Sequence, residues 1–160
     1  MSGFIKVNVD AAYVDGRAAA ALVIRNDQGH LLYLASKLFK CVSPFVAEVE
    51  ALCWAADYVE TCAWRMIEWE TDAKDVETAV KAKEDPSNWY AYYPICSIRS
   101  CFERQGWRVT WKNRRSNLVA DAVAKMSLSR NCAFVFYEYS LEAMPPCILN
   151  LIYAEQANAV

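Results

Sequence analysis

Alternating apolar and polar residues open the sequence and predict a set of paired strands. Residues 5–10 alternate in this way, as in a strand with one apolar and one polar face, and Asp10 falls on the polar face. Two apolar runs, at 18–25 and 31–39, flank residues 26–29, whose types favour a reversing turn. We therefore expect three antiparallel strands at the start of the domain.

From residue 47 onwards the apolar positions recur at helical spacing, and they later return to alternation. This order of elements predicts a mixed α/β (α+β) domain over residues 1–130, in which helices cover the faces of a five-stranded sheet. An apolar, acidic tail over 131–160 is expected either to pack back on this domain or to contact another chain. The later elements expected are a helix over 47–63, a strand over 66–72, a short helix over 75–84, a helix over 94–105 that ends at Gly106, a strand over 107–112, and a helix that is capped by Ser116 and runs to about Arg130.

Composition supports one globular domain and excludes several protein classes. The chain has 160 residues, of which 56% are hydrophobic and 22% charged, enough for one core of ordinary size. Its longest apolar runs fall far short of the roughly 20 residues that span a bilayer, and its start lacks the pattern of a secretory signal. Seven cysteines without a Cys-x-x-Cys pair and a single histidine, His30, argue against a zinc or multi-histidine site. We therefore expect a soluble, intracellular protein with reduced cysteines and no membrane partner.

The net charge of −2 argues against a uniformly basic nucleic-acid-binding domain, but the charges are unevenly distributed. Residues 99–130 carry eight lysines and arginines against two acidic residues, which is a local charge of +6. Such a region is suited to binding a polyanion. The same charges are equally typical of an exposed helix and strand surface, so charge alone leaves both interpretations open.

Four carboxylates stand where a metal site is conceivable. If the first and fourth strands are parallel neighbours, Asp10 and Asp72 at their ends come close together, while Glu48 lies beside the apolar stripe of the first helix and Asp121 lies early in the last helix. Crowded carboxylates repel one another by about 4 kcal/mol per pair at 4 Å and an effective dielectric constant near 20. An all-oxygen site suits Mg²⁺ or Mn²⁺, and two such ions can activate water and stabilise the leaving oxygen of a phosphodiester. The alternative is that these are separate surface residues, with Glu48 favoured by the helix dipole.

Five short motifs follow one another along the chain, namely VNVDAA at 7–12, VIRNDQG at 23–29, AEVEAL at 47–52, ETD at 70–72 and RRSNLVADAVA at 114–124. In this order they resemble the ribonuclease H-like family, and most closely its plant reverse-transcriptase-like branch, which is related to retroelement ribonuclease H domains. The resemblance covers about residues 4 to 130. Glu50 is a competing acid in the third motif, but Glu48 is the one that follows the alanine, as the family pattern requires.

The resemblance implies both a fold and an activity. The fold is a five-stranded mixed sheet in the order 3-2-1-4-5. The activity is endonucleolytic hydrolysis of the RNA strand of RNA–DNA hybrids by a mechanism that uses two Mg²⁺ or Mn²⁺ ions. The catalytic and metal-binding residues implied are Asp10, Glu48, Asp72 and Asp121, and the substrate-binding residues implied are Lys112, Arg114, Arg115 and Asn117.

Departures from the family pattern support a second hypothesis. Residues 112–114 occupy the loop in which many active members carry a histidine, and alanines at 18–21 stand where the family has a glycine-rich strand. The alternative is therefore a catalytically weak, domesticated module that binds nucleic acid or a protein partner. Two other segments are candidates for such contacts, namely the aromatic run over 89–93 and the tail over 131–160.

Overall fold

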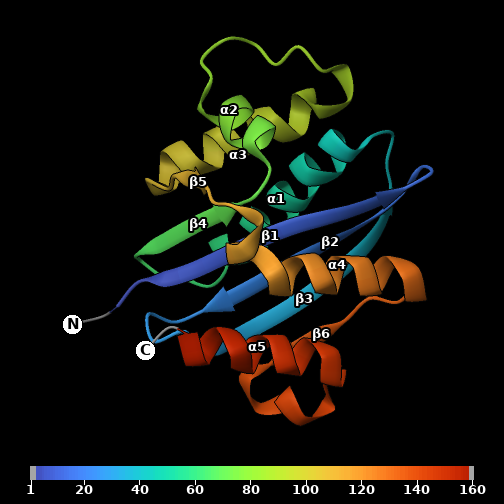
Figure 1. The fold of residues 1–160 in the computed structure, drawn as a ribbon. Helices are drawn as coiled ribbons and strands as arrows, with labels where there is room; N and C mark the ends of the chain where they lie inside the picture. The colour runs from blue at the N-terminus through green and yellow to red at the C-terminus, as the bar shows by residue number, and fades with distance from the viewer. Residues whose placement is uncertain (1–2, 159–160) are drawn as a thin grey trace.

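The computed structural model describes residues 3–158 as one sheet with helices on both faces (Figure 1). In this part of the chain, no helix combines the length and the apolarity needed to cross a bilayer. The elements are β1 (Ile5–Val14), β2 (Arg17–Arg25), β3 (Leu31–Lys40), α1 (Pro44–Glu60), β4 (Ile67–Thr71), α2 (Lys74–Lys81), η1 (Trp89–Ala91), α3 (Tyr92–Gln105), β5 (Val109–Trp111), η2 (Arg114–Asn117), α4 (Leu118–Arg130), β6 (Val135–Tyr137), η3 (Glu138–Ala143) and α5 (Pro146–Asn158), where η denotes a 3₁₀ turn.

The strand order of the sheet is β5-β4-β1-β2-β3-β6. It contains the predicted order 3-2-1-4-5, with β1 parallel to β4, β4 parallel to β5, and the remaining neighbours antiparallel. The predicted number of five strands was wrong, because β6 adds a sixth at the free edge of β3. Three residues are too few to produce a recognisable alternation, so the sequence pattern did not reveal this strand.

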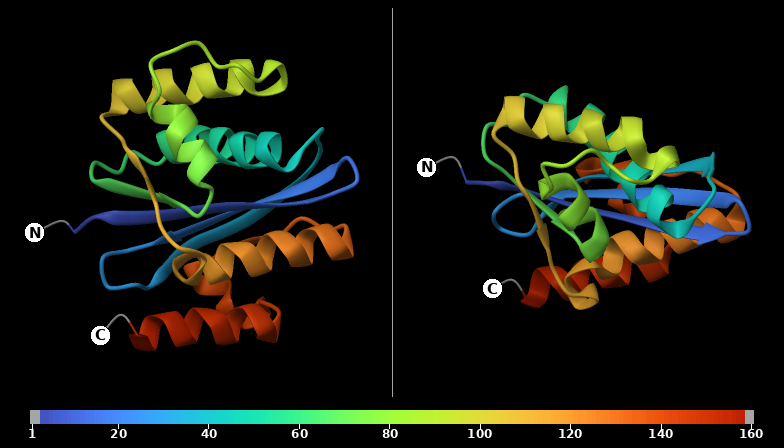
Figure 2. Two further views of the ribbon diagram at one scale, coloured as in Figure 1. Left: turned by 45° about the horizontal axis from the view of Figure 1, so that its top comes forward. Right: turned by 90° about the horizontal axis from the view of Figure 1, so that it is seen from above.

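Helices α1, α2 and α3 lie on one side of the sheet, and α4 and α5 lie on the other (Figure 2). The central strand β2 is buried on both faces. Leu22 and Ile24 belong to the apolar core on the α1 side, and Ala21 and Val23 belong to the core on the α4 side. This two-sided burial explains why β2 has a continuous apolar run, in contrast to the alternation at the start of β1.

The tail beyond residue 130 packs back on the domain. Phe136 of β6 is paired with Leu34 of β3, and Ile148 and Ile152 of α5 are buried in the core that α4 forms with the sheet. Figure 1 shows α5 running alongside α4 below the sheet. The tail therefore contributes both a strand and a helix to the domain.

The starts of two helices differ from the predicted ones. Helix α1 begins at Pro44, three residues before the predicted start, because the Ser43 hydroxyl accepts a hydrogen bond from the Val46 N–H at 3.2 Å. The predicted capping role of Ser116 was wrong. Ser116 lies within the turn η2, and α4 begins after Asn117.

Gly106 ends α3 in the left-handed region, with φ +71°, as its position after the helical pattern predicted. No heavy atom lies within 4 Å of the place where a Cβ would be. A larger residue at this position would therefore be disfavoured by backbone strain alone, and not by a steric clash. We expect Gly106→Ala to lower the free energy of unfolding by about 1 kcal/mol, measured by urea denaturation. Gly106→Asn should lose less, because asparagine tolerates this conformation; equal losses in the two variants would contradict the explanation.

Candidate active site

The site lies where β4 ends and β1 continues. The parallel pairing of the two strands ends at Val9 and Thr71, whereas β1 extends to Val14 alongside β2. Asp10 and Asp72 are the next residues after this last pair, so the register brings their side chains together at the end of β4. The predicted proximity of these two aspartates follows directly from this register.

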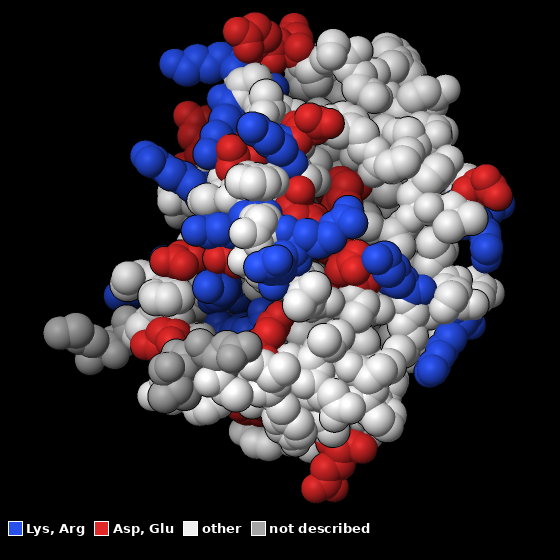
Figure 3. All heavy atoms as spheres, in the orientation of Figure 1, with Lys and Arg blue, Asp and Glu red and all other residues white. Residues whose placement is uncertain are grey.

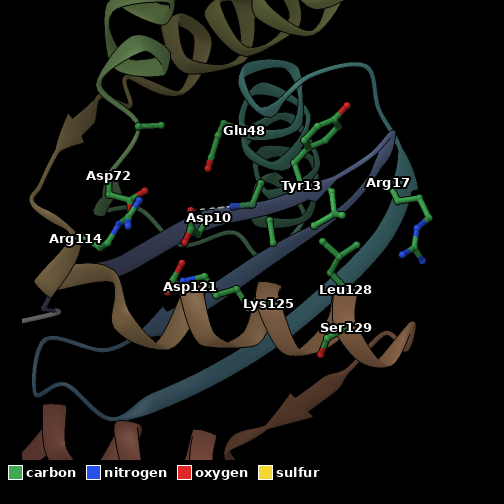
Figure 4. Close-up of a pocket in the computed structure, with 14 residues that line it drawn as sticks. Asp10, Tyr13, Arg17, Glu48, Asp72, Arg114, Asp121, Lys125, Leu128 and Ser129 are labelled. Carbon is green, nitrogen blue, oxygen red and sulfur yellow. Dashed lines mark hydrogen bonds and ion pairs between the residues drawn. The ribbon is translucent and has the colours of Figure 1, made fainter.

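Two further carboxylates reach the same place from helices on opposite sides of the sheet. Glu48 comes from α1, which packs on β1 and β2, and Asp121 comes from the first turn of α4, which packs on the same strands from the other side. Figure 4 shows all four carboxylates directed toward a common space. One oxygen each of Asp10, Glu48 and Asp72 lie within 4.8 Å of one another, and we call these three residues the carboxylate triplet.

Asp121 lines the same cleft but is not part of the triplet. The cleft has a volume of about 670 Å³ and also contains three basic residues, Arg17, Arg114 and Lys125. In Figure 4, Arg17 lies at the far end of the cleft and points away from the carboxylates. Arg114 and Lys125 are therefore the basic residues of the cleft that lie next to the carboxylates.

Asp10 is the most deeply buried member of the triplet, with 3% of its surface exposed. Its Oδ1 accepts a hydrogen bond from the Ala11 N–H at 2.9 Å, whereas its buried Oδ2 has no hydrogen-bond partner. Burial, and then the charges of Glu48 and Asp72, raise the pKa of Asp10 far above its ordinary value of 3.8. Burial likewise raises the pKa of Glu48, with repulsion from Asp72 and Asp121 adding to it.

These properties fit a hard divalent cation. The donor set consists only of carboxylate oxygens, which Mg²⁺ and Mn²⁺ prefer, and a cation would satisfy the buried Asp10 Oδ2, which has no donor to bind it. It would also offset the repulsion that raises the pKa of Asp10 and Glu48. The triplet is therefore the part of the site best suited to hold an ion.

Two basic side chains pair with the outer carboxylates. The Arg114 Nε lies 3.8 Å from the Asp72 Oδ2, and the Lys125 Nζ lies 2.9 Å from the Asp121 Oδ2. Both basic side chains are mostly exposed, so they are free to move toward a ligand. In Figure 3, lysines and arginines gather on this face over β5, η2 and α4, around acidic side chains.

The structure separates the four residues implied as substrate-binding. Arg114 lines the cleft with the carboxylates, whereas Lys112 and Arg115 line a second cavity of about 640 Å³ that also contains Arg25. Asn117 is buried, and its side chain donates a hydrogen bond to the Val9 carbonyl at 3.1 Å. It therefore joins α4 to β1 next to Asp10. Consecutive residues of the tight turn η2 point in different directions, which spacing along the chain did not reveal.

Sequence analysis did not single out Lys125, although a signal for it was present. It follows Asp121 by four residues in a predicted helix, and this spacing places the two side chains on the same face. The structure also distinguishes the two acids of the third motif. Glu48 lines the cleft, whereas Glu50 lies in a separate small pocket beside Lys37.

A protein-family model described as reverse transcriptase-like matches residues 8–127, a segment that contains all four carboxylates. The chain belongs to the reverse transcriptase-like family. This membership confirms the ribonuclease H-like resemblance of the motifs, and the plant branch within it stays a prediction. A search of curated proteins found no match for this family member.

Solved structures of ribonucleases H share the fold of this reverse transcriptase-like chain. Ribonuclease H1 of the archaeon Halobacterium salinarum is 21% identical, with a TM-score of 0.73 over 80% of this chain and 99% of that one. LC11 ribonuclease H1, isolated from compost and solved in complex with an RNA/DNA hybrid, is 16% identical, with a TM-score of 0.71 over 79% and 98%. The N-terminal ribonuclease H domain of a Mycobacterium tuberculosis protein is 16% identical, with a TM-score of 0.72 over 81% and 96%. These likenesses establish the ribonuclease H fold.

Proposed function

We propose that the chain is a metal-dependent endonuclease that hydrolyses the RNA strand of RNA–DNA hybrids by a two-metal mechanism. The observation that carries this proposal is the carboxylate triplet, in which Asp10 is buried with one oxygen lacking any partner. Burying carboxylates so close together destabilises the protein unless a cation compensates, so the arrangement favours a metal-binding role over a purely structural one.

Each of the two ions would be bound by a different set of the four carboxylates. Asp10 would contact both ions, Glu48 and Asp72 would complete the first set of ligands, and Asp121 would complete the second. Bound Mg²⁺ or Mn²⁺ would supply an activated water and stabilise the leaving oxygen of the phosphodiester. The protein's own contribution is to hold the carboxylates on four rigid elements, β1, α1, the end of β4 and α4, so that little reorganisation is needed when substrate binds.

The basic residues around η2 are suited to hold the nucleic acid backbone. Arg114 reaches the carboxylate cleft, and Lys112 and Arg115 line the neighbouring cavity. Arginine and lysine at these places would contact phosphates on both sides of the turn, which positions a strand without reading its sequence. A hybrid substrate is supported by the shared fold with LC11 ribonuclease H1, which was solved bound to an RNA/DNA hybrid.

The test is cleavage of an end-labelled RNA strand in an RNA–DNA hybrid, with Mg²⁺, Mn²⁺ or EDTA. We expect cuts within the RNA strand in the presence of either ion, no cleavage in EDTA, and loss of cleavage in Asp72→Asn. Single-stranded RNA, duplex RNA and duplex DNA serve as control substrates. Folded protein that binds the hybrid in a salt-dependent manner but leaves it intact with both ions would overturn the nuclease and support the alternative of a binding module.

A further inference from the structure

Lys125 forms an ion pair with Asp121, which is one of the proposed metal ligands and lies on the same helix, α4. The pair spans four residues of α4, with 2.9 Å between the Lys125 Nζ and the Asp121 Oδ2. The Lys125 side chain is 63% exposed and that of Asp121 is 21% exposed. Because both residues line the carboxylate cleft, the ammonium group stands at the oxygen that a second ion would need.

The positions of the four carboxylates divide the site into two unequal parts. Asp10, Glu48 and Asp72 converge without a basic side chain of their own at the buried Asp10 Oδ2. Asp121 stands outside this triplet and already has a positive partner. Within the triplet only Asp72 has a basic neighbour, with 3.8 Å between its Oδ2 and the Arg114 Nε, so a cation can enter at Asp10 and Glu48 without displacing a basic group, whereas a cation that approaches Asp121 has to displace an ammonium group at 2.9 Å.

Lysine is well suited to such an exchange. Its charge sits at the end of a flexible four-carbon chain, so it can leave a carboxylate without any movement of the helix. Its spacing from Asp121 returns it to the same oxygen whenever that position is free. The ammonium group and a divalent ion repel each other, so binding of one disfavours binding of the other.

We propose that Lys125 is a positioning residue that acts as an internal counter-ion for Asp121 and competes with the second divalent ion. This inference rests on the proposed two-metal function and deepens it. Lys125 holds the Asp121 carboxylate in place while the first ion binds at the carboxylate triplet. Because it competes with the second ion only, it makes the second ion bind more weakly than the first. The second ion binds only when its concentration is high enough to displace the ammonium group.

The chain offers a matched control for this pair. Lys81 and Glu77 also form an ion pair that spans four residues of one helix, α2, with 3.6 Å between the Lys81 Nζ and the Glu77 Oε2. Their side chains are 54% and 21% exposed, nearly the same as those of Lys125 and Asp121. Neither residue lines the carboxylate cleft, so Lys81→Met removes a helix pair of the same spacing and similar exposure without touching the site.

The experiment titrates Mn²⁺ into the full chain without substrate, by calorimetry and by electron paramagnetic resonance of the free ion. For Lys125→Met we expect the Kd of the weaker ion to fall by about tenfold, because a positive charge next to that ion is removed, with little change in the tighter ion. Lys125→Arg keeps the charge and should bind both ions as the natural chain does, and so should Lys81→Met. Thermal unfolding verifies that each variant is folded.

The outcomes separate this inference from the proposed function. An unchanged Kd in Lys125→Met, the same change in Lys81→Met, or a single ion bound by every variant would each overturn the role of Lys125. If the natural chain cleaves hybrids while Lys125→Met has an unchanged isotherm, only the inference fails. If the Kd shifts as expected but no variant cleaves a hybrid with either ion, the inference stands and the nuclease fails.

Discussion

Asp10→Asn is expected to abolish hydrolysis of RNA–DNA hybrids and, at the same time, to make the metal-free protein more stable. The loss should reach about a thousandfold, because Asp10 is proposed to contact both ions, such a ligand contributes several kcal/mol to catalysis, and each 1.36 kcal/mol is a factor of ten. The gain in stability arises because the substitution removes a carboxyl whose Oδ2 is buried without a partner. We expect about 1–3 kcal/mol, or roughly 2–4 °C in Tm for each kcal/mol, measured in EDTA.

The effect on stability should depend on pH in a defined direction. Because the pKa of Asp10 is raised above its ordinary 3.8, the folded metal-free protein holds a proton that the unfolded chain releases. The contribution of Asp10 to the free energy of unfolding should therefore be most favourable below about pH 4. It should fall as the pH rises toward the pKa of Asp10 in the folded protein. Urea denaturation in EDTA between pH 5 and about 9 should show this fall, and Asp10→Asn should flatten it.

A control on an exposed aspartate separates this effect from a general loss of charge. Asp57 lies on the exposed side of α1, and Asp57→Asn should retain the fall in stability that Asp10 causes. Added Mg²⁺ or Mn²⁺ should stabilise the natural chain more at pH 8 than at pH 5, and should stabilise Asp10→Asn much less. A metal-free Asp10→Asn variant that is less stable than the natural chain would contradict the account of Asp10 as an uncompensated carboxyl.

Glu155→Leu is expected to destabilise the protein strongly. The buried Arg25 guanidinium donates a hydrogen bond from Nη1 to the Asn8 Oδ1 at 2.8 Å, and its Nη2 pairs with the Glu155 carboxylate. Removing the carboxylate leaves a buried positive charge without its ionic partner. We expect a loss of about 3 kcal/mol, which corresponds to roughly 6–12 °C in Tm by thermal unfolding.

The double variant Arg25→Met with Glu155→Leu should recover much of this loss, because an apolar pair does not need a charged partner. Arg104→Met is the matched surface change, since it breaks the more exposed ion pair between Arg104 and Glu60. It should cost far less than Glu155→Leu, because solvent screens an exposed pair. If Glu155→Leu cost no more than Arg104→Met, the buried pair would not be what fastens α5 to the sheet.

Much of the fold followed from local patterns. Alternation located β1, two apolar runs around a turn located the β2–β3 hairpin, Gly106 marked the end of α3, and the motifs implied the strand order that the sheet contains. The convergence of Asp10 and Asp72 was predictable because both stand at the ends of strands that pair in parallel. These features depend on residues that are close in sequence or on the pairing of two strands, so they can be predicted from the sequence pattern.

Other features depend on three-dimensional geometry that cannot be inferred from the spacing of residues along the chain. The turn η2 directs Arg114 toward the carboxylates and Arg115 toward a different cavity, and it buries Asn117. Lys112, which precedes the turn, lines the same cavity as Arg115. The short strand β6 forms because β3 offers it a free edge, and not because its three residues favour a strand by themselves. The pairing of Arg25 with Glu155 joins positions 130 residues apart, and only the folded chain brings them together.

The position of Glu155 on the last described helix also bears on how the protein is made. Residues 146–158 leave the ribosome after every other described element, at about 5–20 residues per second. Until they emerge, the Arg25 guanidinium on the growing chain has no carboxylate from α5 to neutralise it. A nascent chain stalled before α5 should therefore remain sensitive to proteases even though the strands and helices around the carboxylate cleft have already been synthesised.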